Sequence, residues 1–322
     1  MRPDRATVAA FIGVVVFGGL NGIAVKKSLD ELAPFWSAGA RFLAAGLLLT
    51  GFVLVTGRQL PRGRSLSGGL LYGIVGLAAA FGLIYPALGE VPVGTVILFL
   101  ALVPLETFGL AILHRQERFH PQGLMGALIA LAGVAVVVAD QLSTSVPIGP
   151  MLLALAGTLF IAESAVILKW VPRSDPFATN AVAMLGGGMA LLAVSLVAGE
   201  AWIIPSRAPT WLAMGYLVLL GSIAMFGLFL YAVRRWTASA VSYVTLLMPL
   251  VTIPLAALLI GERVSILFVV GGLLAVVGVY VGAFLRIRPG RSSATSAPEC
   301  MPVDNCGPPV RASRPPRPAT PG

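Results

Sequence analysis

The feature that most constrains the fold is a series of long apolar segments. Each is about 20 residues long with few or no charges, the length of α-helix that crosses roughly 30 Å of hydrocarbon. Ten such segments lie approximately at residues 6–25, 34–55, 68–88, 92–113, 121–138, 148–169, 177–198, 210–233, 238–260 and 264–285. A membrane β-barrel would need alternating strands of roughly 10 residues, which are absent. The sequence therefore predicts an all-α integral membrane protein with ten transmembrane helices.

The composition agrees with this class. Hydrophobic residues make up 57% and charged residues 11% of the chain, against roughly 25% charged residues in soluble domains. The net charge of +9 could suggest a nucleic-acid partner, but the basic residues are scattered over short loops and a C-terminal tail rather than gathered on one face. We therefore expect a lipid bilayer around the chain and no nucleic acid.

One motif occurs twice in the sequence. Each copy contains a proline followed thirteen positions later by a Glu-Arg pair, with Glu117 after Pro104 and Glu262 after Pro249. Two glycines follow each Glu at matched distances, so the copies are offset by 145 residues throughout: Gly126 and Gly133 against Gly271 and Gly278. A second register lies upstream at an offset of 142, with Lys27, Pro34 and Phe35 against Lys169, Pro176 and Phe177. The chain is therefore predicted to be an internal duplication.

The duplication divides the chain into a first repeat at 1–139, a linker at 140–147, a second repeat at 148–285 and a Pro-rich basic tail at 286–322. The tail has little to bury and is expected to be disordered. Five helices per repeat is an odd number, so the second repeat must enter the membrane from the opposite side. Inverted repeats are a common basis of secondary transporters, which alternate access to a site near the midplane.

The distribution of Lys and Arg predicts the orientation, because cytoplasmic loops carry the excess. One set of alternate loops, with the termini, holds Arg2, Arg5, Arg58, Arg62, Arg64, Arg115, Arg118, Lys169, Arg173, Arg234, Arg235 and the tail arginines. The other set holds only Lys26, Lys27, Arg207 and Arg263. Both termini are therefore expected in the cytoplasm of a multi-pass protein of the cell membrane, inner or plasma.

The ten spans, the five-plus-five duplication and the repeated Pro-to-Glu-Arg-to-Gly motif together resemble the EamA family of the drug/metabolite transporter superfamily. The resemblance covers nearly everything from about Phe11 to Leu285. It implies an exporter of amino acids, related metabolites or drugs, with helices one, three and four of each half lining a central cavity. Glu106 departs from the family pattern, which more ordinarily has an uncharged residue there, and Val251 occupies the matching position in the second repeat.

Two carboxylates lie within the predicted spans, Glu106 and Glu163, and a buried carboxylate in a membrane is a functional candidate by default. Glu106 shares a helical face with Thr95, and Glu163 aligns with Asn21 of the first repeat. We expect these residues on a substrate or proton pathway. The alternatives are a protonated Glu106 that joins two helices, and a local ion pair between Glu163 and a cation.

Further polar candidates lie on the second and ninth spans. Thr245 and Thr252 share a face of the ninth span with Tyr243 nearby, and they are placed on the same pathway, although hydroxyls often only join helices. Arg41 is close enough to the outer end of its helix to pair with Asp30 or Glu31, so a structural or gating ion pair is favoured over substrate contact. Pro104 and Pro249 should kink their helices, and Glu117 and Glu262 should cap or orient the short connections in which they lie.

No cofactor, metal or catalytic site is expected. Cys300 and Cys306 are separated by a spacing that matches no usual zinc site, and His114 and His120 lack partners at ligand spacing. No nucleophile and base pair is apparent, so an enzyme is not expected. The favoured function is secondary export of a small solute coupled to protons through Glu106, Glu163 or both. The alternatives are a passive facilitator and an intramembrane lipid-handling enzyme.

Overall fold

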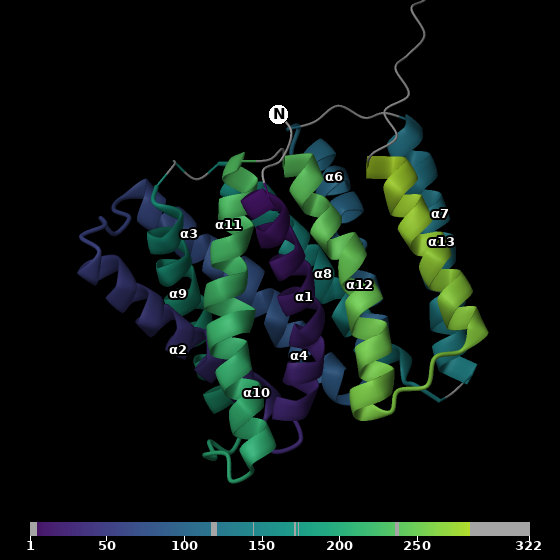
Figure 1. Ribbon diagram of the computed structural model, residues 1–322, viewed down its shortest axis with the longest axis horizontal. Coiled ribbons are helices and arrows are strands. Elements are labelled where there is room, and N and C mark those ends of the chain that lie inside the picture. Colours follow the sequence, from purple (N-terminus) through teal and green to yellow (C-terminus); the bar gives the residue numbers. More distant parts are fainter. Residues whose placement is uncertain are drawn as a thin grey trace, which may run out of the picture. The chain divides into compact units, whose positions relative to one another are not determined.

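The structure is a computed structural model that describes residues 5–283, except for positions 117–120, 144, 171, 173, 236 and 237. Every regular element within this part of the chain is a helix (Figure 1). In order these are α1 (Arg5–Ser28), α2 (Pro34–Val55), α3 (Arg64–Gly73), η1 (Ile74–Ala79), α4 (Ala80–Glu90), α5 (Val93–Leu100), α6 (Val103–Leu113), α7 (Pro121–Ser143), α8 (Ile148–Leu168), α9 (Pro176–Val197), α10 (Ala208–Val218), η2 (Leu219–Ala224), α11 (Met225–Arg235), α12 (Ala238–Ile260) and α13 (Ile266–Ala283). The all-α prediction is therefore confirmed for the described residues.

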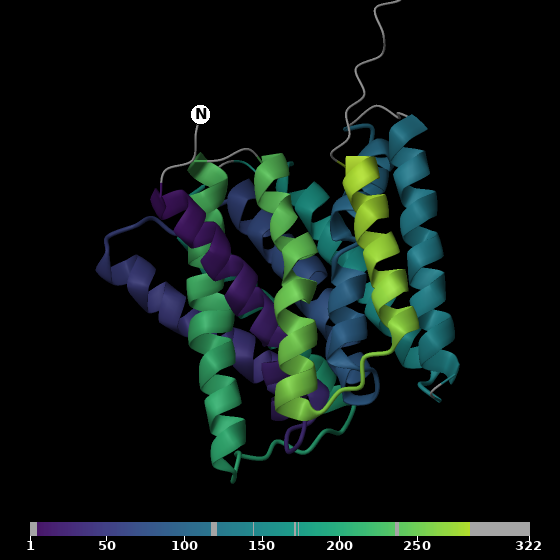
Figure 2. The same cartoon turned by 45° about the vertical axis from the view of Figure 1, so that its right-hand side comes forward.

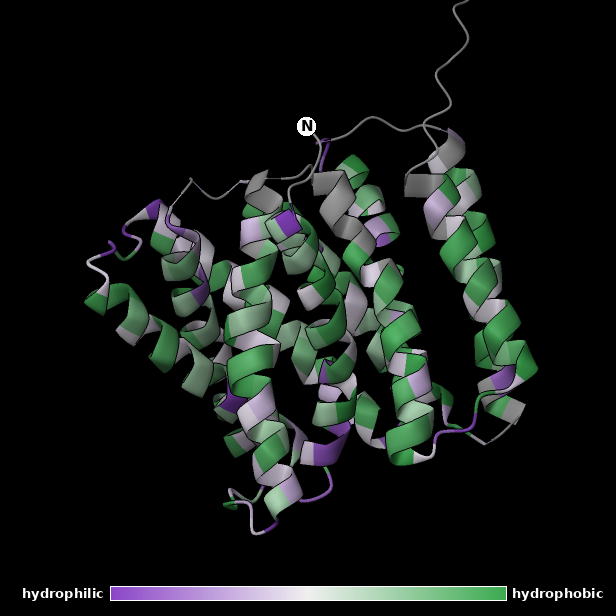
Figure 3. Ribbon diagram, viewed as in Figure 1, coloured by the Kyte–Doolittle hydropathy of each residue, from purple (hydrophilic) through white to green (hydrophobic). Residues whose placement is uncertain are grey.

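The helices have the length and composition of membrane spans. Among the described residues, eight helices are long and apolar enough to cross a membrane, and α12 and α13 contribute the shorter apolar stretches Leu247–Ile260 and Ile266–Gly278. Figure 3 shows apolar residues along the shafts and hydrophilic residues mainly at helix ends and in loops. Large apolar side chains such as Leu131 and Leu212 remain exposed on the outer faces. Such faces are stable against lipid chains and unfavourable in water.

Two of the predicted spans are interrupted at matched places by π-helical turns. The segment η1 (Ile74–Ala79) joins α3 to α4, and η2 (Leu219–Ala224) joins α10 to α11. Their first residues are separated by 145 positions, the same offset as the repeated motif. A π turn widens the helix and displaces backbone carbonyls from the α-helical pattern, and such turns are frequent at functional sites.

The two motif prolines lie in different local structures. The predicted span at 92–113 is divided, because α5 ends at Leu100 and α6 begins at Val103, with Pro104 in the first turn of α6. Pro249 lies inside the continuous helix α12 instead. Ala101 and Leu102, between the two helices, keep right-handed helical backbone angles.

Helices α2 and α9 pack side by side in opposite directions. At one end, Glu200, which follows α9, accepts hydrogen bonds from the backbone N–H groups of Phe35 and Trp36 at 3.1 and 2.8 Å. At the other end, Arg58, which follows α2, donates to the carboxylate of Asp175 at 2.7 Å. Asp175 in turn caps the first turn of α9. The polar contacts therefore fix both ends of an otherwise apolar interface.

Helices α7 and α13 form a second antiparallel pair, seen side by side in Figures 1 and 2. A Cβ added to Gly133 would lie 2.6 Å from the carbonyl oxygen of Gly271, and one added to Gly278 would lie 2.8 Å from that of Gly126. These are the four glycines of the repeated motif. Their absent side chains allow the two backbones to touch, as small residues do in membrane helix pairs.

In two further interfaces, the first helix of each half packs on helices of the other half. Helix α1 packs on α10, α11 and α12, while α8 packs on α3, α4, α5 and α6. Gly19 of α1 lies close to Val251 of α12, because a Cβ added to Gly19 would be 2.9 Å from the Val251 Cβ. The polar residues of the predicted spans lie along these interfaces.

Candidate functional site

Glu106 lies in the first turn of α6 and faces α8. Its Oε1 accepts a hydrogen bond of 2.9 Å from the hydroxyl of Thr158, a residue that is completely buried. Its Oε2 is also buried and has no hydrogen-bond partner among the described residues. A buried carboxylate oxygen without a protein donor is costly unless the group takes up a proton or meets a ligand. Sequence analysis did not identify Thr158, although it is a polar residue within an apolar span.

Glu163 lies further along the same α6–α8 interface. Its carboxylate is 3.0 Å from Nε2 of His114, which ends α6, and both side chains are about one quarter exposed. The ring of Trp170 packs edge-on against His114 with centroids 5.2 Å apart. Glu106 and Glu163 are thus on one interface with separate partners.

Asn21 and Arg41 both donate hydrogen bonds to the π segment η2. The side-chain amide of Asn21 donates to the carbonyl of Gly221 at 3.2 Å, and Nη2 of Arg41 donates to the same carbonyl at 3.0 Å. Arg41 also donates from Nε to Ser222 at 3.0 Å and from Nη1 to the hydroxyl of Tyr85 at 3.1 Å.

Arg41 was expected to reach the outer interface, and this expectation was wrong. Its side chain is 1% exposed, because α1, α2, α4 and η2 surround it. Asp30 pairs with Lys27 and Glu31 bonds to Ser206, so neither of the predicted carboxylate partners is near Arg41. The guanidinium lies over the rings of Phe42 and Phe81 at 4.9 and 5.7 Å instead.

The hydroxyl of Thr252 on α12 donates to the carbonyl of Gly19 on α1 at 2.6 Å and is completely buried. Thr252 therefore joins two helices, the commoner use of an intramembrane hydroxyl. Thr245 lies on the same helix and is half-buried. The side chain of Tyr243 and the whole of Glu117 lie outside the described residues.

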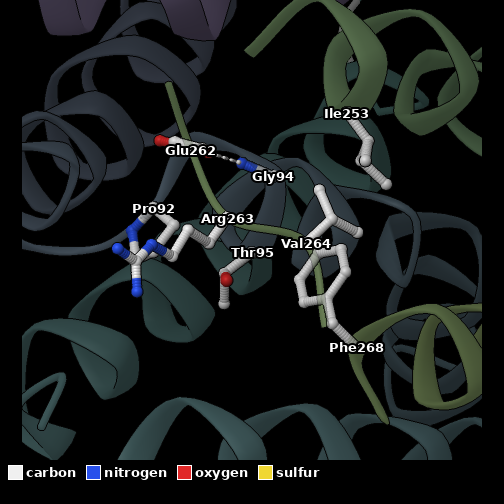
Figure 4. A pocket seen from close by; sticks show the side chains of 8 residues that line it. All are labelled: Pro92, Gly94, Thr95, Ile253, Glu262, Arg263, Val264 and Phe268. Carbon is white, nitrogen blue, oxygen red and sulfur yellow. Dashed lines mark hydrogen bonds between the residues drawn. The ribbon is translucent and has the colours of Figure 1, made fainter. Parts of the chain in front are cut away.

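Glu262 lies in the connection between α12 and α13 and caps the start of a different helix. Its carboxylate accepts hydrogen bonds from the backbone N–H groups of Val93 and Gly94 at 2.7 and 3.2 Å, and it lies 3.7 Å from Nζ of Lys26. Thr95, whose buried hydroxyl has no partner in the described part of the chain, lines a cavity of about 10 Å³ beside it (Figure 4). This is room for roughly one water molecule.

At the same end of the molecule, the start of α2 and the residues before it contact the loop between α9 and α10. Trp36 stacks on Trp202 with centroids 4.7 Å apart and donates from Nε1 to the carbonyl of Ile203 at 2.9 Å. Glu31 accepts hydrogen bonds from the hydroxyl and, at 2.6 Å, the backbone N–H of Ser206. By the distribution of basic residues, this end is predicted to face the outside.

The contact of Glu31 with Ser206 predicts a pH dependence. Hydrogen bonds from the Ser206 hydroxyl and N–H lower the pKa of Glu31 from 4.5 to about 2. A carboxyl whose folded pKa is depressed contributes stability above its unfolded pKa and loses it as the pH falls through the folded value. We therefore expect the difference in melting temperature between the wild type and Glu31→Gln to be constant above about pH 4.5 and to shrink toward pH 2. Thermal unfolding in detergent tests this, and a difference independent of pH would contradict it.

The described residues were also compared with the requirements of a metal site. Among the described residues, no group of three His, Cys, Asp or Glu side chains is placed to hold a metal ion. Cys300, Cys306 and His120 lie outside those residues. Six of the predicted site residues thus fall into three groups: Glu106 and Glu163 between α6 and α8, Asn21 and Arg41 around η2, and Thr95 with Glu262 at one end.

Comparison with known proteins gives a consistent result. Residues 5–139 and 149–283 each match the model of the EamA-like transporter family. The chain is 29% identical over 257 residues to the "Uncharacterized inner membrane transporter YedA" of Escherichia coli K12, a match that covers 80% of this chain and 83% of that protein. It is 27% identical over 287 residues to a "Probable amino-acid metabolite efflux pump" of the same organism, covering 85% and 94%.

A solved crystal structure has the same fold. It matches with a TM-score of 0.63 at 19% sequence identity, over 87% of this chain and 98% of the other. At this identity the likeness concerns the path of the backbone alone.

Proposed function

The chain belongs to the EamA-like transporter family, and from that premise we propose that it is a secondary active exporter of small metabolites, coupled to protons through Glu106. That the chain is a multi-pass membrane transporter of small solutes rather than an enzyme follows from its family and relatives. The architecture, the coupling and the class of solute are the proposal.

The proposed architecture is a pair of inverted five-helix repeats, 1–139 and 148–285, joined by a linker at 140–147. Three observations support it. The family model matches the chain twice, the π segments η1 and η2 recur at the offset of the motif, and α2 and α7 each pack antiparallel to their counterparts α9 and α13. Ten spans with both termini on one side of the membrane follow from this arrangement, and the distribution of Lys and Arg favours the cytoplasm as that side, with the tail 286–322 there.

The single observation that supports proton coupling is the environment of the Glu106 carboxylate. The residue is on a helix that packs against the other half of the chain, one carboxylate oxygen bonds to Thr158 of that half, and the other oxygen is buried without a partner. A carboxylate in this position is stable when protonated and unstable when charged, unless water or a cationic solute reaches it. A change in the packing of α6 on α8 would therefore change the affinity of Glu106 for a proton.

Two observations support export of small metabolites. A relative that aligns over nearly its whole length is named an amino-acid metabolite efflux pump. The sequence contains no nucleotide-binding motif in its loops, so a gradient rather than nucleotide hydrolysis would drive transport. We accordingly propose amino acids or related compounds as the solutes, and the cell membrane as the location.

Reconstitution into proteoliposomes with an imposed pH gradient tests this proposal. Radiolabelled amino acids and cationic compounds, first selected by reduced retention in cells that overproduce the protein, are the probes. We expect accumulation against the solute gradient, abolished by a protonophore. Equilibration without accumulation would indicate a passive facilitator, and product formation in unsealed membranes would indicate an enzyme; either result would overturn the proposal.

A further inference from the structure

Arg41 is a buried cation that has no carboxylate partner among the described residues. The residue is 1% exposed, and its guanidinium donates hydrogen bonds to the hydroxyl of Ser222, the hydroxyl of Tyr85 and the backbone carbonyl of Gly221. The ion pairs found among the described residues involve Lys26, Lys27, Arg58 and His114, and none involves Arg41.

This arrangement is unusual energetically. A charge removed from water is costly unless an opposite charge and hydrogen bonds replace its hydration, and Arg does not lose its proton in proteins. The aromatic rings of Phe42 and Phe81 and the three neutral acceptors offset part of that cost. The net positive charge of the cluster remains, so an anion that reached it would be bound favourably.

The guanidinium retains the donors that an anion would need. Arg has five N–H groups in a planar fork, and one on each terminal nitrogen is left after the bonds to Tyr85 and Gly221 are made. Two N–H groups on adjacent nitrogens match the two oxygens of a carboxylate, whereas Lys offers a single point charge.

An acceptor lies beside these donors. Oδ1 of Asn21 is buried and has no hydrogen-bond partner in the described part of the chain. A Cβ added to Gly221 would overlap this oxygen and would lie 3.4 Å from Nη2 of Arg41. Oδ1 of Asn21 and Nη2 of Arg41 therefore both lie against the side of Gly221 that carries no Cβ, and only a glycine lets Asn21 approach so closely. The π turn η2 supports this geometry, since it directs the Gly221 carbonyl toward both side chains.

The cluster lies about two helical turns from the start of α2. Arg41 is on α2, whose first turn is held by Glu200 and whose Trp36 stacks on Trp202. We expect release of these contacts to admit a solute to Arg41 from this side.

We propose that Arg41 and Asn21, together with Gly221, form the binding site for the carboxylate and amino groups of a transported α-amino acid. Arg41 binds the carboxylate through its two remaining N–H groups, and Oδ1 of Asn21 accepts a hydrogen bond from the ammonium group. This inference deepens the proposed export function and rests on it for the identity of the solute class. The second half cannot supply an equivalent charge, because Ala183 matches Arg41 at the offset of 142.

The test compares each amino acid with its own amide. Purified protein in detergent is heated with the common L-amino acids and with the corresponding α-carboxamides, which keep the side chain and amino group but lack the carboxylate. We expect at least one acid to raise the melting temperature while its amide does not. Because hydrogen bonds to charged groups are strong, Arg41→Gln should weaken binding of that acid by about tenfold or more, with Arg41→Lys intermediate.

A second variant leaves the charge of Arg41 in place. In Gly221→Ala the added Cβ would displace the side-chain oxygen of Asn21, so binding of the acid should weaken to a similar extent while Arg41 itself is unchanged. Gly215→Ala is the matched control, because its added Cβ in α10 would meet nothing within 4 Å. We expect the control to bind as the wild type does.

The outcomes distinguish this inference from the proposed export function. Equal stabilisation by acids and amides, stabilisation by neither, or full acid binding by Arg41→Gln would each overturn the carboxylate site. Gradient-driven accumulation of a solute without a carboxylate would leave the export proposal intact while the site fails. Acid binding that depends on Arg41, without any transport in sealed vesicles, would support the site and contradict export.

Discussion

Glu106→Gln is expected to abolish accumulation driven by a pH gradient while leaving solute exchange between the two sides of the membrane in place. Gln has nearly the shape of Glu, and its oxygen can accept the hydrogen bond that Thr158 donates at 2.9 Å. The packing of α6 on α8 should therefore be kept, and only the ability to bind and release a proton is lost. Proteoliposomes measure both quantities: uptake under an imposed gradient should fall to the level seen without one, and counterflow should remain.

Glu163→Gln is the matched variant for this experiment. Its carboxylate lies on the same interface but is paired with His114 and partly exposed. We expect it to keep gradient-driven uptake, since the proposed proton carrier is untouched. If both variants accumulate solute with the pH dependence of the wild type, the assignment of coupling to these carboxylates is wrong, and if only Glu163→Gln fails, the carrier is Glu163.

Gly133→Val is expected to prevent assembly of α7 with α13 and to remove most of the folded protein from the membrane. The first added carbon would lie 2.6 Å from the carbonyl oxygen of Gly271 and would overlap the backbone of Ala275. Overpacking a well-packed interior costs typically ~1–3 kcal/mol when side chains can move. Here the obstacle is backbone, so the two helices must separate along their length.

Size-exclusion chromatography of detergent extracts and the melting temperature of any recovered protein measure this effect. Gly109→Val on α6 is the control, because it introduces the same side chain into a helix at an exposed position with nothing within 4 Å. The control should elute and melt as the wild type does. A monodisperse Gly133→Val protein of unchanged stability would refute the close approach of α7 and α13.

Much of the fold follows from the sequence, and particular residues indicate why. The predicted span 34–55 coincides with α2, and the prediction 238–260 coincides with α12. The bilayer fixes the length of an apolar helix, so counting apolar residues locates its ends. The motif glycines were recognised by their matched spacing, but their role in the contact between α7 and α13 was not. Spacing records that two segments are alike without stating that they touch.

The candidate sites were less predictable. Sequence analysis selected Glu106, Glu163, Asn21 and Arg41 because polar groups are rare in spans, but it paired none of them with the partners that the structure gives. It offered Arg41 the nearby Asp30 and Glu31, whereas the guanidinium bonds to Ser222, 181 positions away. Glu262 was expected to cap or orient its own connection, and it caps α5, where Val93 lies 169 positions from it.

The sequence by itself determined that the chain is a membrane protein of apolar helices with a repeated motif, since hydrophobic length and residue spacing are local properties that need no knowledge of neighbours. The tertiary structure alone decided which polar groups meet and which are left without a partner, as with Oε2 of Glu106 and the charge of Arg41. Helical periodicity identifies the face on which a side chain lies. Which helix lies against that face depends on how all the helices pack together, and within a membrane that packing decides whether a polar group is satisfied.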